Sequence, residues 1–160
     1  MRVLFYILFF LLSFAVSFAD SSIKDLEKRL ETAEIDDKII ILNKLAELYS
    51  DKDAKRAIDY ATKAAELSKP QQNRRQIARA FNTIGKAHIH AGKTQYSIEY
   101  FKKALQLNKY LKDYLELAKT LNNIGVAHRY TSNFSSALKY HLEAIEYSQR
   151  ASSIEPSVCK

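Results

Sequence analysis

FNTIGKAH, the stretch from Phe81 to His88, recurs almost unchanged forty residues later as LNNIGVAH, from Leu121 to His128. The shift of 40 residues places Gly85 on Gly125, and matches continue on both sides of this stretch. A third copy lies upstream at shifts of 39 and 40 residues, with alanine in place of the glycine. Self-similarity at such a period predicts a stacked-repeat architecture.

Each copy contains two helical patterns separated by a break. In the second copy, spacings of three and four residues connect first Ile77, Phe81, Ile84 and His88, and then Ile98, Phe101, Leu105 and Asn108. This spacing predicts amphipathic helices. The breaks fall at Gly92-Lys93 and Ser132-Asn133 within copies and at Lys69-Pro70 between copies. No alternating strand pattern appears beyond the first 19 residues, so we expect an all-α fold.

Glycine recurs in the middle of a predicted helix, at Gly85 and Gly125. It costs about 1 kcal/mol there relative to alanine. The repetition weighs against glycines that are merely tolerated and indicates a close approach by the second helix of the same copy. We expect small residues to oppose each other in the pairs Ala46 with Ala64, Gly85 with Ala104, and Gly125 with Ala144.

These residues resemble the longer form of the tetratricopeptide repeat family. The resemblance rests on a hydrophobe and a small residue in the first helix (Leu45-Ala46, Ile84-Gly85, Ile124-Gly125), and on a small residue (Ala57, Ser97, Ala137), a ring (Phe101, His141) and an alanine (Ala64, Ala104, Ala144) in the second. The sequence departs from the family pattern in two ways. His88 and His128 stand where the family has an aromatic residue, and the closing proline is absent. The resemblance implies a right-handed superhelical stack of antiparallel helix pairs, an α-solenoid. Its three repeats would lie at about 36–69, 71–109 and 111–150.

The ends of the chain differ from the repeats. Residues 1–19 combine Arg2, an apolar run and a small-x-small site before Asp20, a layout typical of a secretory signal peptide. The alternative is a retained membrane anchor, because the apolar run is only just long enough to cross a bilayer. Residues 20–35 are expected to form a capping helix, and residues 151–160 a disordered tail. The expected location is therefore periplasmic or secreted, after cleavage following Ala19.

The resemblance implies that the first helices line a concave groove. Asparagines recur on them at equivalent positions, with cationic side chains nearby. The predicted peptide-binding residues are Asn43, Arg79, Asn82, Lys86, Lys119, Asn122, Asn123 and Arg129. Asparagine amides can hold a peptide backbone on both sides, so we expect the groove to bind an extended, somewhat acidic protein segment. The alternative is that the asparagines stabilise the stack through hydrogen bonds between helices.

Composition and motifs limit the other classes of function. The chain has 25 basic and 18 acidic residues, and removal of Arg2 with the signal segment leaves 24 minus 18, or +6. These charges are interspersed, which is typical of a solvated surface rather than a nucleic-acid interface. We find no phosphate-binding loop, no nucleophile elbow and no clustered Cys/His pattern, and so expect no enzyme, no metal and no cofactor. The single cysteine, Cys159, provides no intrachain disulfide.

A second functional interpretation is a sensory or assembly module. A signal peptide followed by long-form repeats is similar to the extracytoplasmic tetratricopeptide regions of bacterial sensor kinases and regulators. No capping helix follows the third copy, although a stacked array normally needs one. Either another chain covers the last helix, which would make a homo-oligomer, or the sequence is a shortened piece of a longer protein.

Overall fold

The computed structural model describes residues 22–154, and every regular element in this range is a helix. A helix at residues 22–32 is followed by α2 (Ile35–Tyr49), α3 (Ala54–Ser68), α4 (Arg74–His90), α5 (Thr94–Leu111), α6 (Tyr114–Tyr130) and α7 (Phe134–Ile154). The predicted all-α fold is confirmed. The predicted signal segment, residues 1–19, and Cys159 lie outside the described residues.

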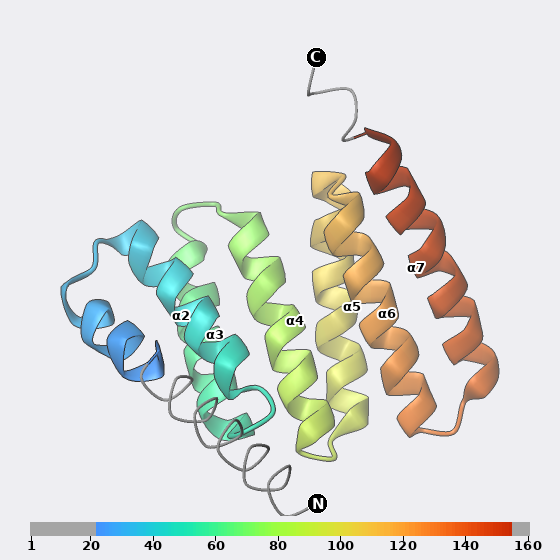
Figure 1. The fold of residues 1–160 in the computed structure, drawn as a ribbon, viewed down its shortest axis with the longest axis horizontal. Helices are drawn as coiled ribbons and strands as arrows, with labels where there is room; N and C mark the ends of the chain where they lie inside the picture. The colour runs from blue at the N-terminus through green and yellow to red at the C-terminus, as the bar shows by residue number, and fades with distance from the viewer. Residues whose placement is uncertain (1–21, 155–160) are drawn as a thin grey trace, which may run out of the picture.

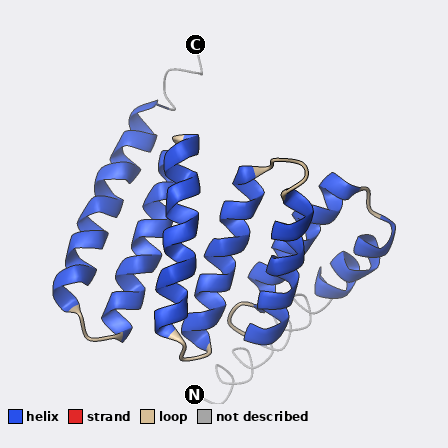
Figure 2. Cartoon of the chain, turned by 180° about the vertical axis from the view of Figure 1, so that it is seen from behind, coloured by secondary structure: helices blue, strands red, loops and turns tan. Residues whose placement is uncertain are grey.

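The helices form three antiparallel pairs, α2 with α3, α4 with α5, and α6 with α7, stacked side by side (Figures 1 and 2). The first helix of the middle pair, α4, also contacts the first helices of both neighbouring pairs, α2 and α6. Among the described helices, the second helices α3, α5 and α7 make no comparable contacts with one another. The first helices therefore lie on the inner side of the stack, as the family resemblance implies.

Asparagine and aspartate side chains start most of these helices. The side chains of Asp53, Asn73, Asp113 and Asn133 each accept a hydrogen bond from the backbone N–H three residues further on. Such N-caps satisfy one of the backbone donors that a helix leaves free at its first turn. The turns before α4, α5, α6 and α7 use left-handed backbone at Gln72, Gly92, Lys112 and Ser132, which brings each of these helices back antiparallel to the last.

The observed boundaries differ from the predicted ones at both ends. The tail predicted at residues 151–160 starts too early, because α7 continues to Ile154. Serine and alanine in that stretch allow the helix to extend, and the side chains of Ser152 and Ser153 bond to backbone carbonyls of the preceding turn. The capping helix occupies residues 22–32 within the predicted 20–35. The second pair ends at Leu111 rather than at residue 109.

The core consists of three connected clusters. Alanines dominate the interface of α2, α3 and α4, whereas Phe101 and Ile124 fill the interface of α5 and α6. The helix at residues 22–32 covers the open side of α2, where Ile23 packs with Ile41 and Leu45. All members of these clusters lie between Ile23 and Tyr140.

The helix glycines face rings rather than the alanines that we predicted. A Cβ at Gly85 would lie 2.6 Å from Cδ1 of Phe101, and a Cβ at Gly125 would lie 2.7 Å from Cε1 of His141. In the first pair, the residue equivalent to these rings is Ala61, and the residue equivalent to the glycines is Ala46. Each pair therefore combines either two alanines or a glycine and a ring, which keeps the two helices close without overpacking.

Gly85→Ala is expected to destabilise the protein. The Phe101 ring is fully buried, so it has no free space into which to move. Overpacking of this kind costs about 1–3 kcal/mol, and the better helix propensity of alanine returns about 1 kcal/mol. We expect a net loss of up to about 2 kcal/mol in the free energy of unfolding, measured by urea denaturation.

Two further variants complete this test. Gly125→Ala should cost less, because the opposing His141 is only half-buried and its ring can shift. The double variant Gly85→Ala/Phe101→Ala recreates the alanine pair of the first repeat and should lose less stability than the sum of the two single changes. Additive losses would show that the glycine and the ring do not constrain each other.

Candidate functional site

A pocket of about 360 Å³ lies on the inner side of the stack, between α2, α4 and α6. Its lining is polar on all three helices. It comprises Glu47 and Ser50 near the end of α2, Arg79, Asn82, Thr83 and Lys86 on α4, and Glu116, Lys119 and Asn123 on α6. Five of the eight predicted binding residues, Arg79, Asn82, Lys86, Lys119 and Asn123, are therefore brought together here.

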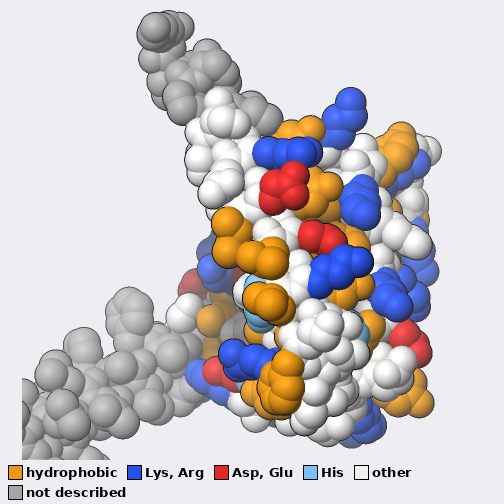
Figure 3. All heavy atoms as spheres, turned by 90° about the vertical axis from the view of Figure 1, so that its right-hand side faces the viewer, with side chains coloured by type: hydrophobic (Ala, Val, Ile, Leu, Met, Phe, Trp, Pro, Cys, Tyr) orange, Lys and Arg blue, Asp and Glu red, His pale blue; other side chains and the backbone are white. Residues whose placement is uncertain are grey.

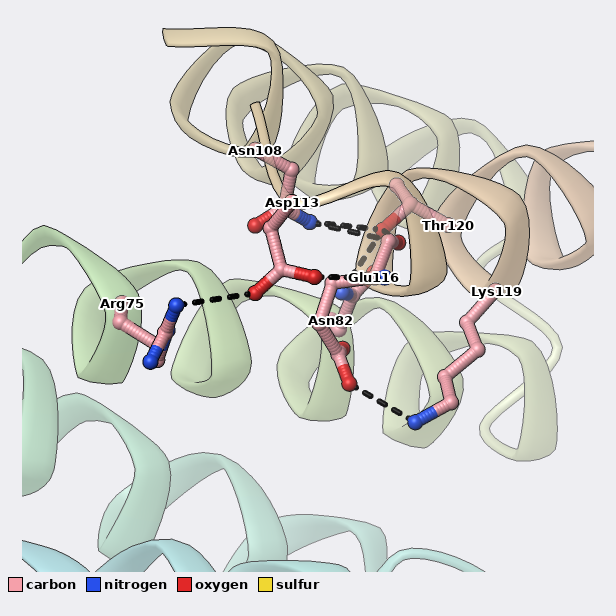
Figure 4. Close-up of polar contacts among 7 residues, drawn as sticks. All are labelled: Arg75, Asn82, Asn108, Asp113, Glu116, Lys119 and Thr120. Atoms are coloured by element: carbon pink, nitrogen blue, oxygen red, sulfur yellow. Dashed lines mark hydrogen bonds and ion pairs between the residues drawn. The ribbon is translucent and has the colours of Figure 1, made fainter. Parts of the chain in front are cut away.

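A buried hydrogen-bond network sets the distance between α4 and α6 below this pocket (Figure 4). Oγ1 of Thr120 accepts bonds from Nδ2 of Asn82 at 2.9 Å and from Nδ2 of Asn108 at 3.1 Å. The same hydroxyl donates to the backbone carbonyl of Glu116 at 2.7 Å. One threonine thus ties α4, α5 and α6 together at a point from which water is excluded.

An ion pair adds a second link between α4 and the start of α6. Arg75 lies 3.4 Å from the carboxylate of Asp113, which is the N-cap of α6 (Figure 4). Arg75 is well exposed, so this pair orients α6 more than it stabilises it.

Two of the predicted asparagines form hydrogen bonds between neighbouring helix pairs. Asn43 is buried and donates through Nδ2 to the side-chain and backbone oxygens of Gln76 on α4. Asn82 is only 8% exposed and donates to α6, as described above. The Oδ1 atoms of both asparagines are shielded from solvent and accept no bond from the described residues. The amide groups of Asn43 and Asn82 are therefore engaged in helix-to-helix bonding, as the alternative interpretation proposed.

The remaining predicted residues, Asn122 and Arg129, lie apart from this pocket. Asn122 is exposed, and its Oδ1 lies 3.0 Å from Nδ1 of His141 on α7. It occupies the position equivalent to Asn82, but within the described residues no helix follows α7 to cover it. Arg129 is exposed at the end of α6 and does not line the pocket.

Cationic side chains dominate the accessible part of the pocket. Nζ of Lys119 lies 2.8 Å from the carboxylate of Glu116 on the same helix, which neutralises both groups (Figure 4). Within residues 22–154, Arg79 and Lys86 form no ion pair, although both are exposed at the pocket. The only other charged group in the lining is Glu47. The pocket therefore offers a ligand two positive charges, the exposed carboxylate of Glu47 and the half-buried amide of Asn123.

Sequence reasoning missed Ser50, Thr83 and Glu116 as pocket residues, and Thr120 as the centre of the network. Asn108 falls in the apolar pattern of the second copy, and a buried position for this polar side chain is the sequence signal for a hydrogen-bond partner. Thr120 has no such signal, because its equivalent in the second copy is Ala80.

The two repeat histidines stack on tyrosines of their own helix pair. His88 lies between Tyr96 and Tyr100, with ring centroids 5.6 and 5.5 Å away. His128 lies on Tyr140 at 5.3 Å with nearly parallel rings. Burial, and secondarily a nearby lysine, lower the pKa of both histidines below the usual 6.5. Among the described residues, no group of His, Cys, Asp or Glu is arranged to hold a metal ion.

Stability should fall as the pH drops below about 6.5, because a lowered folded-state pKa favours the neutral ring. The contribution of His88 and His128 is complete above the unfolded-state pKa and is lost as the pH falls towards the folded-state pKa. Urea midpoints at pH 7.5 and pH 5.5 should show a decrease that the variant His88→Phe/His128→Phe reduces, since phenylalanine keeps the stacking.

The exposed His90 provides a control. His90→Gln should leave the decrease unchanged. A pH dependence that survives the double phenylalanine variant would locate its origin in other groups.

Among the described residues, no helix has the length and apolar character needed to cross a membrane.

Comparisons with known proteins agree with this architecture. The fold is similar to the tetratricopeptide repeat domain of FLU from Arabidopsis, with a TM-score of 0.66 and 15% identity over 73% of this chain and 99% of that one. It is also similar to BtubC (BKLC) from P. vanneervenii, with a TM-score of 0.65 and 17% identity over 84% of this chain and 56% of that one. A comparison with curated proteins finds none that matches.

The family model of the tetratricopeptide repeat matches residues 76–150, which include α5, α6 and nearly all of α4 and α7. The same arrangement of helices continues upstream through α2 and α3. With its stacked antiparallel pairs and its recurring small residues, the chain belongs to the tetratricopeptide repeat family.

Proposed function

We propose that this chain is a non-enzymatic scaffold that binds an extended, acidic segment of a partner protein in the pocket between α2, α4 and α6. Tetratricopeptide repeat domains generally bind protein partners, and the fold is consistent with such a role. The finer proposal concerns the place of binding and the chemistry of the segment.

One observation carries the proposal: Arg79 and Lys86 are exposed at the pocket and have no anionic partner among the described residues. They lie seven residues apart on α4, or about 10 Å along the helix. Consecutive side chains on one face of an extended segment are about 7 Å apart. Two carboxylates on one face of such a segment could therefore each approach one of these cations.

The rest of the lining suits a peptide backbone. The half-buried Asn123 carries both a donor and an acceptor, and the hydroxyl of Ser50, which donates to the backbone carbonyl of Glu47, adds an acceptor. Asn82 is not needed for direct contact in this account, because its Nδ2 is already bonded to Thr120. Its role is to keep α4 and α6 at the spacing that the segment requires.

The test is binding of the chain from Asp20 to Lys160 to an array of extended peptides, presented as matched glutamate and glutamine versions. The glutamate versions should bind more tightly at low salt, and the preference should shrink at high salt. Arg79→Gln/Lys86→Gln should weaken binding by about tenfold or more, because charge-assisted hydrogen bonds are lost.

The matched control is Lys55→Gln/Lys109→Gln, which removes the same charge from exposed positions on α3 and α5 away from the pocket. This control should retain binding. Equal weakening by both double variants would indicate attraction to net charge alone. An array in which no glutamate version is preferred would reject the acidic segment.

We further propose that the scaffold acts outside the cytoplasm, in the periplasm or as a secreted protein. Support comes from the sequence of residues 1–19, with its apolar run and small-x-small site.

Production of the full 160-residue chain in a bacterial host should yield a periplasmic or secreted form whose N-terminal residue is Asp20. Intact-mass measurement of that fraction checks the cleavage site. An uncleaved chain recovered with the membrane would instead support the retained anchor.

A further inference from the structure

The outer face of α7 carries a stripe of exposed apolar side chains. Phe134, Leu138, Leu142 and Ile145 are between 55% and 66% exposed. Their spacings of three and four residues place them on one side of the helix. Figure 3 views this end of the stack, where hydrophobic side chains lie along the surface between charged ones.

Part of the equivalent face is covered in the preceding helix pair, although Lys102, the equivalent of Leu142, is exposed. Leu138 corresponds to Ile98 on α5, which is 6% exposed because it packs with Ile124 and Ala127 of α6. Ile145 corresponds to Leu105, which is half-buried in the same cluster. The stripe on α7 therefore has the composition of a helix-packing surface, but no described helix covers it.

We infer that this stripe is the interface of a homodimer in which two copies of α7 pack antiparallel about a two-fold axis near Leu142. In a two-fold interface, if one residue of the first copy contacts another residue of the second copy, the same contact also forms with the two copies exchanged. Leu138 lies four residues before Leu142, and Ile145 lies three residues after it. Antiparallel packing thus places each Leu138 against Ile145 of the second copy, with the two Leu142 side chains at the axis.

Charge favours the same orientation. Lys139 and Glu146 lie seven residues apart, on one edge of the stripe and on opposite sides of Leu142. Antiparallel packing brings Lys139 of each copy beside Glu146 of the other, whereas parallel packing about a two-fold axis would put these residues of the two copies on opposite edges of the interface, where they could not pair. Glu146 also pairs with Arg150 on its own helix, but both are exposed and such a pair contributes little.

The length of α7 is sufficient for such an interface. Its 21 residues extend over about 31 Å, and helices pack at interaxial distances of about 8–10 Å. The dimer interface lies on the end of the stack, whereas the peptide pocket lies on its inner side between α2, α4 and α6. The dimer proposal is therefore independent of the proposed function, and each can fail without the other.

The first experiment is sedimentation velocity and equilibrium of the chain from Asp20 to Lys160 over a range of concentrations, in a Cys159→Ser background that excludes disulfide pairing. We expect a reversible monomer–dimer equilibrium. Leu142→Glu should raise the dimer dissociation constant by about tenfold or more, because it places unpaired carboxylates at the axis. Ile40→Glu, at an exposed isoleucine on α2, is the matched control and should leave the dimer unchanged.

A charge exchange tests the orientation. Lys139→Glu should weaken the dimer, and Lys139→Glu/Glu146→Lys should restore it, because the pairs form again with opposite sign. Helical circular dichroism would verify that each variant is folded. A chain that remains monomeric at all concentrations, a dimer unaffected by Leu142→Glu, or a double charge variant that stays weak would overturn the proposal.

Discussion

The hydrogen bond from Asn82 to Thr120 is the contact on which the inner side of the molecule depends. It joins the first helices of two successive pairs, and Asn108 joins the same hydroxyl from the intervening helix α5. Apolar contacts alone would allow α4 and α6 to slide, because they are non-directional. A buried amide donor left without its partner costs about 1–3 kcal/mol, so this network strongly favours one spacing. The width of the pocket between Arg79 and Lys119 follows from that spacing.

Two different constraints thus operate within and between the helix pairs. Within a pair, side-chain volume decides the approach, since a glycine faces a ring or an alanine faces an alanine. Between pairs, directional polar contacts add to the apolar core, at Asn43 with Gln76 and at Asn82 with Thr120. The same side of α4 and α6 that carries the buried polar residues also lines the pocket, and the pocket is therefore polar. The outer face of α7 meets no further described helix pair and exposes an apolar surface.

Much of this architecture could be predicted from the sequence, because the forty-residue period and the helical spacing determine the helix pairs. The side chain that faces each glycine could not be predicted, because periodicity does not give the rotation of a helix about its axis. The rings of Phe101 and His141 lie where we expected alanines. Equivalent positions also need not share an environment. Asn82 and Asn122 are related by the repeat, yet α6 buries the first and nothing described buries the second. The pocket depends on such neighbours, which explains why only part of the predicted set came together.

The most direct measurement is hydrogen–deuterium exchange of asparagine side-chain amides, followed by NMR in the unliganded chain. The two Nδ2 protons of Asn82 should exchange far more slowly than those of Asn122, whose side chain is exposed, because the Asn82 amide is bonded to Thr120 in the interior. Slow exchange would establish the network that holds α4 to α6. Exchange at the same rate for both residues would show that this network does not persist in solution, and that the spacing of the inner helices has another origin.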